Sequence, residues 1–205
     1  MTRTSSRGLL HLIAILSTTF VLASSSQAGL LNGHIDAFGG VSGSVPFNNG
    51  VGLSGTIDYA VFSAADFNAN FAGLGYVPGD ALVYTYQVLV TGSLGVSAEI
   101  VGISNPANTI GTFDIGDQNA SSASFTPNAR WLFSPEIPTN LSSWGLAFSS
   151  PQLPIVGASL TIDGGTQALV AGVPTPGPLG IPEPASLLLL ASSLAATFLL
   201  RHRRP

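Results

Sequence analysis

The chain of 205 residues contains no cysteine and no lysine, and charged residues make up only 8% of it. Without cysteine there is no disulfide, no thiolate nucleophile and no cysteine-ligated zinc. Without lysine the chain cannot form a Schiff base. We expect no cofactor, and a folded domain of this chain must be held together by its apolar core.

The few basic residues are placed at the two ends. All six are arginines, and five of them lie within residues 1–28 or 181–205, so that Arg130 is alone in between. Nine acidic residues share this middle segment, which gives it a net charge of about −8. Because such a surface repels phosphate groups, we do not expect nucleic acid or anionic lipid headgroups as partners.

Residues 1–28 have the features of a secretory signal peptide. Two arginines precede an uncharged, apolar stretch over residues 9–23, and small residues stand at the −3 and −1 positions before Gly29. That pattern predicts cleavage between Ala28 and Gly29 after export. The two arginines are not adjacent, which favours the general secretory route over the twin-arginine route.

The segment 181–205 has three parts with different physical properties. The first, residues 181–184, holds two prolines around a carboxylate, a stiff handle that cannot enter a helix interior. The second, residues 185–200, is uncharged and rich in leucine and alanine, which predicts a transmembrane helix. The third, residues 201–205, is a basic end formed by Arg201, Arg203 and Arg204. Arginine stays protonated, so this end is expected to stop transfer on the cytoplasmic side.

The expected helix is short for a permanent membrane anchor. Sixteen residues give about 24 Å of helix, whereas the hydrocarbon core is about 30 Å thick. A short span of this kind fits a temporary anchor.

The combination of Pro182, Glu183 and Pro184 with a short apolar run and terminal arginines resembles the PEP-CTERM sorting signal. In that family a membrane-embedded exosortase of Gram-negative, exopolysaccharide-producing bacteria recognises and cuts the signal. The resemblance implies an exosortase as the processing partner and cleavage near the triplet. It also implies an inner-membrane-anchored precursor that moves to the cell surface or extracellular matrix. It covers only this end of the chain.

The segment between the two signals is expected to be an all-β domain over residues 29–172. Short alternating apolar runs are separated by turn residues, and eight or nine strands of this kind indicate an antiparallel β-sandwich. A jelly roll is the alternative, because the pattern does not give the strand order. A capping box that starts at Ser63 predicts one short helix to about Asn70. Residues 173–180, rich in proline and glycine, are expected to form a stiff spacer. The expected strands are 56–62, 81–91, 96–103, 109–115, 122–126, 129–133, 144–148, 155–162 and 167–170.

Two loops carry oxygen ligands that could bind calcium. Asp114 and Asp117 flank a glycine, but the loop lacks the alternating acids and the terminal glutamate of an EF-hand. A plain turn rich in Asp and Asn is the favoured interpretation. The Asp163-Gly164-Gly165 sequence predicts a hairpin turn in the same way. We therefore expect no metal site.

The candidates for catalysis are few. Glu99 and Glu136 are the only glutamates between the two signals, and a glycosidase needs two carboxylates about 5–9.5 Å apart. Glu99 is expected on the solvent face of its strand and Glu136 in a loop, which favours two separate surface charges. His34 is the only histidine of that segment and is expected near a disordered new N-terminus. No catalytic residue is assigned.

Four aromatic residues could form a platform for sugar rings, namely Trp131, Phe133, Trp144 and Phe148. Packing in the core is the favoured interpretation for them.

The sequence as a whole favours a non-enzymatic, exported surface or matrix protein that associates with exopolysaccharide or biofilm. A carbohydrate-binding module and a secreted polysaccharide hydrolase are the alternatives.

Overall fold

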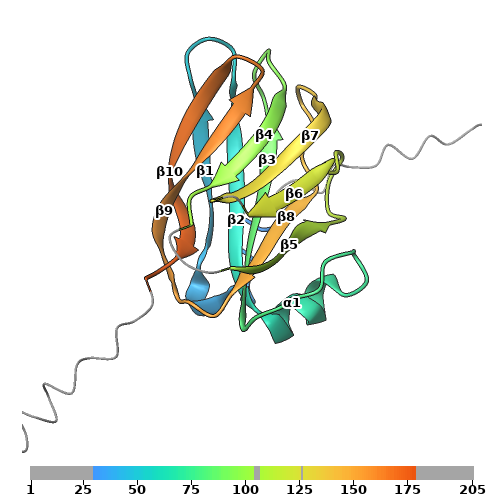
Figure 1. Ribbon diagram of the computed structural model, residues 1–205, viewed down its shortest axis with the longest axis vertical. Helices are drawn as coiled ribbons and strands as arrows, with labels where there is room; N and C mark the ends of the chain where they lie inside the picture. The colour runs from blue at the N-terminus through green and yellow to red at the C-terminus, as the bar shows by residue number, and fades with distance from the viewer. Residues whose placement is uncertain (1–29, 104–106, 126, 179–205) are drawn as a thin grey trace, which may run out of the picture.

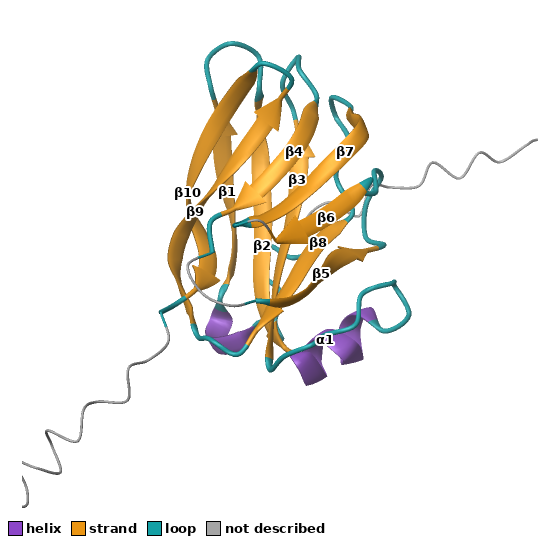
Figure 2. Cartoon of the chain, viewed as in Figure 1, coloured by secondary structure: helices purple, strands orange, loops and turns teal. Residues whose placement is uncertain are grey.

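The structure, a computed structural model, describes residues 30–103, 107–125 and 127–178. Two five-stranded antiparallel sheets face each other, so the predicted β-sandwich is confirmed (Figure 1). Helical structure in these residues is confined to α1 and a short 3₁₀ segment, η1 (Figure 2). The elements are η1 (Phe38–Gly40), β1 (Ser42–Asn48), β2 (Ser54–Ser63), α1 (Ala64–Phe71), β3 (Leu82–Val90), β4 (Val96–Val101), β5 (Asn108–Phe113), β6 (Ser122–Phe125), β7 (Ala129–Ile137), β8 (Gly145–Ser150), β9 (Pro154–Asp163) and β10 (Thr166–Pro176).

The strand order is β1-β2-β3-β8-β5 in one sheet and β10-β9-β4-β7-β6 in the other. The chain changes sheet five times: between β3 and β4, between β4 and β5, between β5 and β6, between β7 and β8, and between β8 and β9. The triplets β3-β8-β5 and β4-β7-β6 follow the arrangement of a jelly roll, in which a long antiparallel ribbon is wound across two sheets. The jelly-roll alternative therefore describes the centre of the sandwich, and β1, β2, β9 and β10 widen it on one side.

The space between the sheets is filled by the alternate residues that the sequence predicted to share a face. Leu82, Tyr84, Tyr86, Val88 and Val90 of β3 all point into this core. The opposite sheet contributes a second set to the same core. Successive side chains of a strand alternate between its faces, so one face of each sheet can be apolar without interrupting the ladder. The second set includes Val96, Val101, Ala129, Trp131, Phe133, Ile137 and Val170.

A second apolar cluster covers the outer face of the first sheet. Phe67 and Phe71 of α1 pack there with Phe62 and Phe113. The helix begins as predicted: the amide of Asp66 donates to the Ser63 hydroxyl at 3.1 Å, and that hydroxyl donates to the Asp66 carboxylate at 2.6 Å. Because the first sheet is covered on both faces, β3 and β8 are buried along nearly their whole length.

Three expectations about the elements need correction. β1 was not predicted, because its sequence around Pro46 lacks a clear apolar alternation, yet it pairs with β2 along its full length. β8 begins at Gly145, so Trp144 lies before the strand. The expected spacer also starts too early: β10 continues through Pro176, and residues 173–176 are buried. Proline is tolerated there because β10 is an edge strand of its sheet.

Candidate functional site

Glu99 lies inside the sandwich, which corrects the expectation of a solvent-facing side chain. It is fully buried, and its backbone pairs with that of Trp131 across the β4–β7 ladder. Directly paired residues share a face, so Glu99 points into the core beside this indole. The β4–β7 register shifts between Val96 and Ala98. This shift changes which alternate residues of β4 face inward.

The buried carboxyl group has few polar neighbours. Its Oε2 atom accepts a hydrogen bond from the Thr161 hydroxyl at 2.7 Å. Its Oε1 atom has no hydrogen-bond partner within the described residues, and neither has the hydroxyl of the neighbouring Ser159. Burial raises the pKa of Glu99 to about 7, although the hydrogen bond from the Thr161 hydroxyl opposes that shift. The group is therefore protonated in the folded protein below neutral pH.

A surface hollow of about 330 Å³ brings two other acids together, which the sequence did not reveal. Glu136, which was expected in a loop, lies instead on β7, because that strand continues to Ile137. Together with Asp163 at the end of β9 it lines the hollow, next to Ser97 and Pro135. A hydrogen bond with Asp163, together with its negative charge, raises the pKa of the exposed Glu136. These residues are 27 positions apart and come together only through the strand order β9-β4-β7, so no local pattern in the sequence could indicate the pair.

Neither arrangement of carboxylates matches that of a glycosidase. Glycosidases hold their two carboxyl groups about 5–9.5 Å apart so that a sugar fits between them. Glu136 and Asp163 instead lie close enough for Asp163 to raise the pKa of Glu136 through hydrogen bonding and its negative charge. Glu99 and Glu136 do not share a site, since the former faces the sandwich interior and the latter faces solvent.

The Asp114–Asp117 loop uses one of its acids for structure. The Asp117 Oδ2 atom accepts from the Ser142 amide and from the Ser142 hydroxyl, each at 2.9 Å. Asp114 is exposed. Among the residues that the structure describes, no three His, Cys, Asp or Glu side chains are grouped so that they could hold a metal ion. This geometry favours the interpretation as a plain turn, because calcium takes six to eight oxygen ligands.

We expect the substitution Asp117→Ala to lower the free energy of unfolding by about 2 kcal/mol, because it leaves the buried Ser142 with unpaired donors. The matched control Asp114→Ala should change it by less than about 0.5 kcal/mol. Urea denaturation with and without millimolar calcium measures both effects. A calcium-dependent rise in stability that either substitution removes would contradict the structural role and restore the metal site.

Three of the four candidate platform aromatics are core residues. Trp131, Phe133 and Phe148 are buried in the sandwich, and the Trp131 indole donates to the Gly111 carbonyl of the other sheet at 2.9 Å. Only Trp144 is partly exposed. These four residues therefore do not form an exposed platform for a sugar.

His34 is part of the folded domain, contrary to the expectation of a disordered end. Its ring stacks edge-on against Phe62 with 4.9 Å between the ring centroids, and it also approaches Phe71. The neighbouring Leu31 is fully buried. The histidine therefore helps to close the aromatic cluster around α1.

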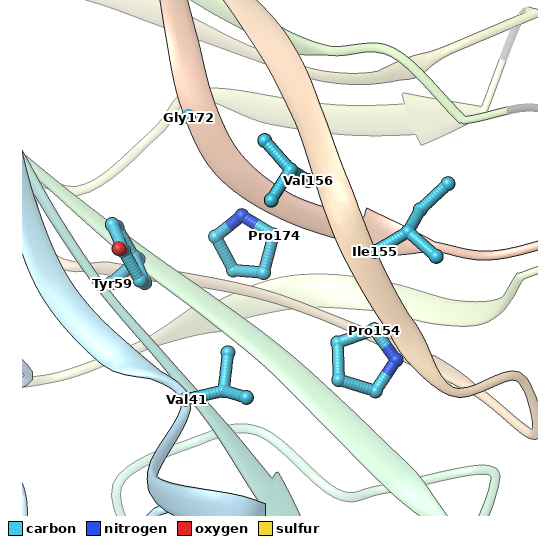
Figure 3. A pocket seen from close by; sticks show the side chains of 7 residues that line it. All are labelled: Val41, Tyr59, Pro154, Ile155, Val156, Gly172 and Pro174. Carbon is cyan, nitrogen blue, oxygen red and sulfur yellow. The ribbon is translucent and has the colours of Figure 1, made fainter.

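A second hollow, mainly apolar and of about 230 Å³, lies between the two sheets. Val41, directly before β1, and Tyr59 of β2 form one side, and Pro154 of β9 and Pro174 of β10 form the other (Figure 3). The Tyr86 hydroxyl donates to the carbonyl of Pro174 from inside the core. The hollow has no ionisable group besides Tyr59, so it offers apolar contact and little else.

The remaining predicted sites fall at the ends of the chain, outside the described residues. They are the cleavage position at Ala28 and Gly29, the helix at 185–200, the triplet Pro182, Glu183 and Pro184, and the basic residues Arg201, Arg203 and Arg204. In the parts of the chain that the structure covers, no helix is long and apolar enough to cross a membrane.

Comparison with known families decides the nature of the C-terminal segment. Residues 180–204 match the family model described as the PEP-CTERM protein-sorting motif. The resemblance inferred from the triplet, the apolar run and the arginines is therefore confirmed. The motif indicates an exosortase-sorted extracellular protein, made as an exported, membrane-anchored precursor. Searches of curated proteins and of solved structures gave no match.

Proposed function

We propose that this chain is a non-catalytic protein of the cell surface or extracellular matrix, which exosortase releases from its membrane anchor. In this proposal the sandwich domain stays in the exopolysaccharide or biofilm layer of the producing cell. The observation that carries the proposal is the sorting motif at residues 180–204, which follows β10 almost directly.

The arrangement of the domain supports a role without catalysis. Glu99 is enclosed in the core and cannot meet a substrate, and Glu136, whose pKa the adjacent Asp163 raises, lies apart from it on the surface. The strongly apolar interior and the low content of charge suit a stable module that persists outside the cell. Contact with polysaccharide would then use the neutral Ser, Thr, Asn and Gly residues of the surface.

We expect the mature extracellular form to lack both residues 1–28 and the helix at 185–200. Intact-mass measurement of extracellular material tests this. In a strain without the exosortase, the chain should keep its full tail and remain in the inner membrane. The substitution Glu183→Ala should reduce processing strongly, whereas the matched substitution Glu136→Ala in the domain should leave it unchanged. Extracellular protein that still carries Arg201 to Pro205 would contradict the processing step.

A further inference from the structure

The open end of the β9–β10 hairpin carries three exposed apolar side chains that are close together in the sequence. We define this end, residues 153–156 together with residues 174–177, as the foot of the domain. Leu153, Ile155 and Val156 are 65%, 47% and 82% exposed. Ile155 and Val156 also line the hollow of Figure 3. A single exposed apolar residue needs no explanation, but a cluster at one end of a domain indicates a contact surface.

The chain leaves the domain at this same end. β10 finishes at Pro176, and the amide of Gly177 donates to the Leu153 carbonyl at 2.8 Å, which fixes the exit of the chain against the foot. Figure 1 shows the end of β10 and the start of β9 together, opposite the turn that joins the two strands. Whatever follows in the sequence therefore starts from the foot.

The distance from the foot to the sorting motif is short. Pro182 lies six positions after Pro176, and an extended chain spans at most about 3.5 Å per residue, which gives about 20 Å. The apolar run at 185–200 begins directly after the triplet. A precursor anchored by this run must hold the foot within about 20 Å of the triplet.

The sequence around the foot also lacks charge. Between residues 149 and 182 the only charged residue is Asp163, which lies at the opposite end of the hairpin. An uncharged apolar surface can enter the headgroup region of a bilayer without desolvating an ion. The acidic remainder of the domain disfavours anionic lipids.

We propose that the foot rests in the headgroup region of zwitterionic lipid while the precursor is anchored, with Leu153, Ile155 and Val156 as the contacting side chains. This inference rests on the proposed membrane-anchored precursor. The contact holds the domain upright, and it places the sorting triplet at the membrane surface, where a membrane-embedded protease works. Cleavage frees the foot, since its hold on the bilayer is too small to anchor the domain alone.

The absence of cysteine allows a direct test on the full chain. Val156→Cys places one fluorophore on the foot, and Leu169→Cys places one on β10, where the native side chain is 75% exposed. Leu169 lies seven residues along the strand from Pro176, about 23 Å away. The labelled precursors are inserted into phosphatidylcholine nanodiscs with a nitroxide-labelled headgroup lipid. We expect at least threefold stronger quenching at position 156 than at position 169.

The possible outcomes separate this inference from the proposal on which it rests. Equal quenching at the two positions, in a precursor that remains bound to the nanodiscs, would overturn the lipid contact and leave the anchor intact. A precursor that does not stay with the nanodiscs would overturn the anchor and the contact together. If quenching at position 156 falls only when two chains share one nanodisc, the foot contacts a second copy of the chain and not lipid. Exosortase is absent from the nanodiscs, so quenching there cannot come from contact with the enzyme.

Discussion

Replacement of Trp131 by alanine should remove about 4 kcal/mol from the free energy of unfolding, within the range of about 3–5 kcal/mol for large aromatic residues in a core. The indole is fully buried and lies 6.3 Å from Tyr86 and 6.4 Å from Phe148, measured between ring centroids. It also joins the two sheets, through its hydrogen bond to the Gly111 carbonyl. The substitution leaves a cavity and an unpaired carbonyl, and neither is readily relieved between two rigid sheets.

Trp144 provides a matched control, since it is the only other tryptophan and is partly exposed. Trp144→Ala should cost about 1 kcal/mol. Trp131→Phe keeps an aromatic ring in the core but loses the N–H group and part of the indole volume, so its cost should fall between those of the two alanine variants. Urea denaturation of the processed protein measures all three. Equal losses for Trp131→Ala and Trp144→Ala would show that the buried indole does not hold the two sheets together.

The stability of the domain should fall as the pH rises from about 4.5 to about 7, because of Glu99. Its carboxyl group has a pKa of about 7 in the folded protein, against 4.5 as the ordinary value. The folded state therefore binds more protons than the unfolded state in this window, and the free energy of unfolding decreases with pH. The raised pKa makes the free energy of unfolding about 3 kcal/mol higher below pH 4.5 than above pH 7. Tyr86, which faces Glu99 from the other sheet, does not titrate in this window because burial raises its pKa well above 10.

The variant Glu99→Gln should lose this dependence on pH. We expect its free energy of unfolding to equal that of the native protein near pH 4 and to exceed it by up to about 3 kcal/mol at pH 8. Denaturation curves from pH 4 to pH 8 measure the difference. Glu136→Gln is the control: its carboxyl is exposed, so solvent screens its contribution. A native slope that persists in the Glu99→Gln variant would place the titrating group elsewhere.

Several features of this protein were determined by local sequence. The alternation from Leu82 to Val90 defined one face of β3, and the capping box at Ser63 defined the start of α1, because each depends on residues a few positions apart. The Gly164-Gly165 pair likewise defined the β9–β10 turn. The sorting motif is of the same kind, since its triplet, apolar run and arginines are contiguous and need no fold to be recognised.

Only the tertiary structure decided the features that depend on strand register and on which strands are neighbours. The irregularity between Val96 and Ala98 changed the inward face of β4 and placed a carboxyl group inside the core, which alternation by itself assigned to solvent. Pairing with β9 extended β10 to Pro176, although its prolines suggested a spacer, because an edge strand needs only one set of hydrogen bonds. The meeting of Glu136 with Asp163 depends on the strand order, which is set by how the two sheets bury their apolar faces and not by any short stretch of sequence.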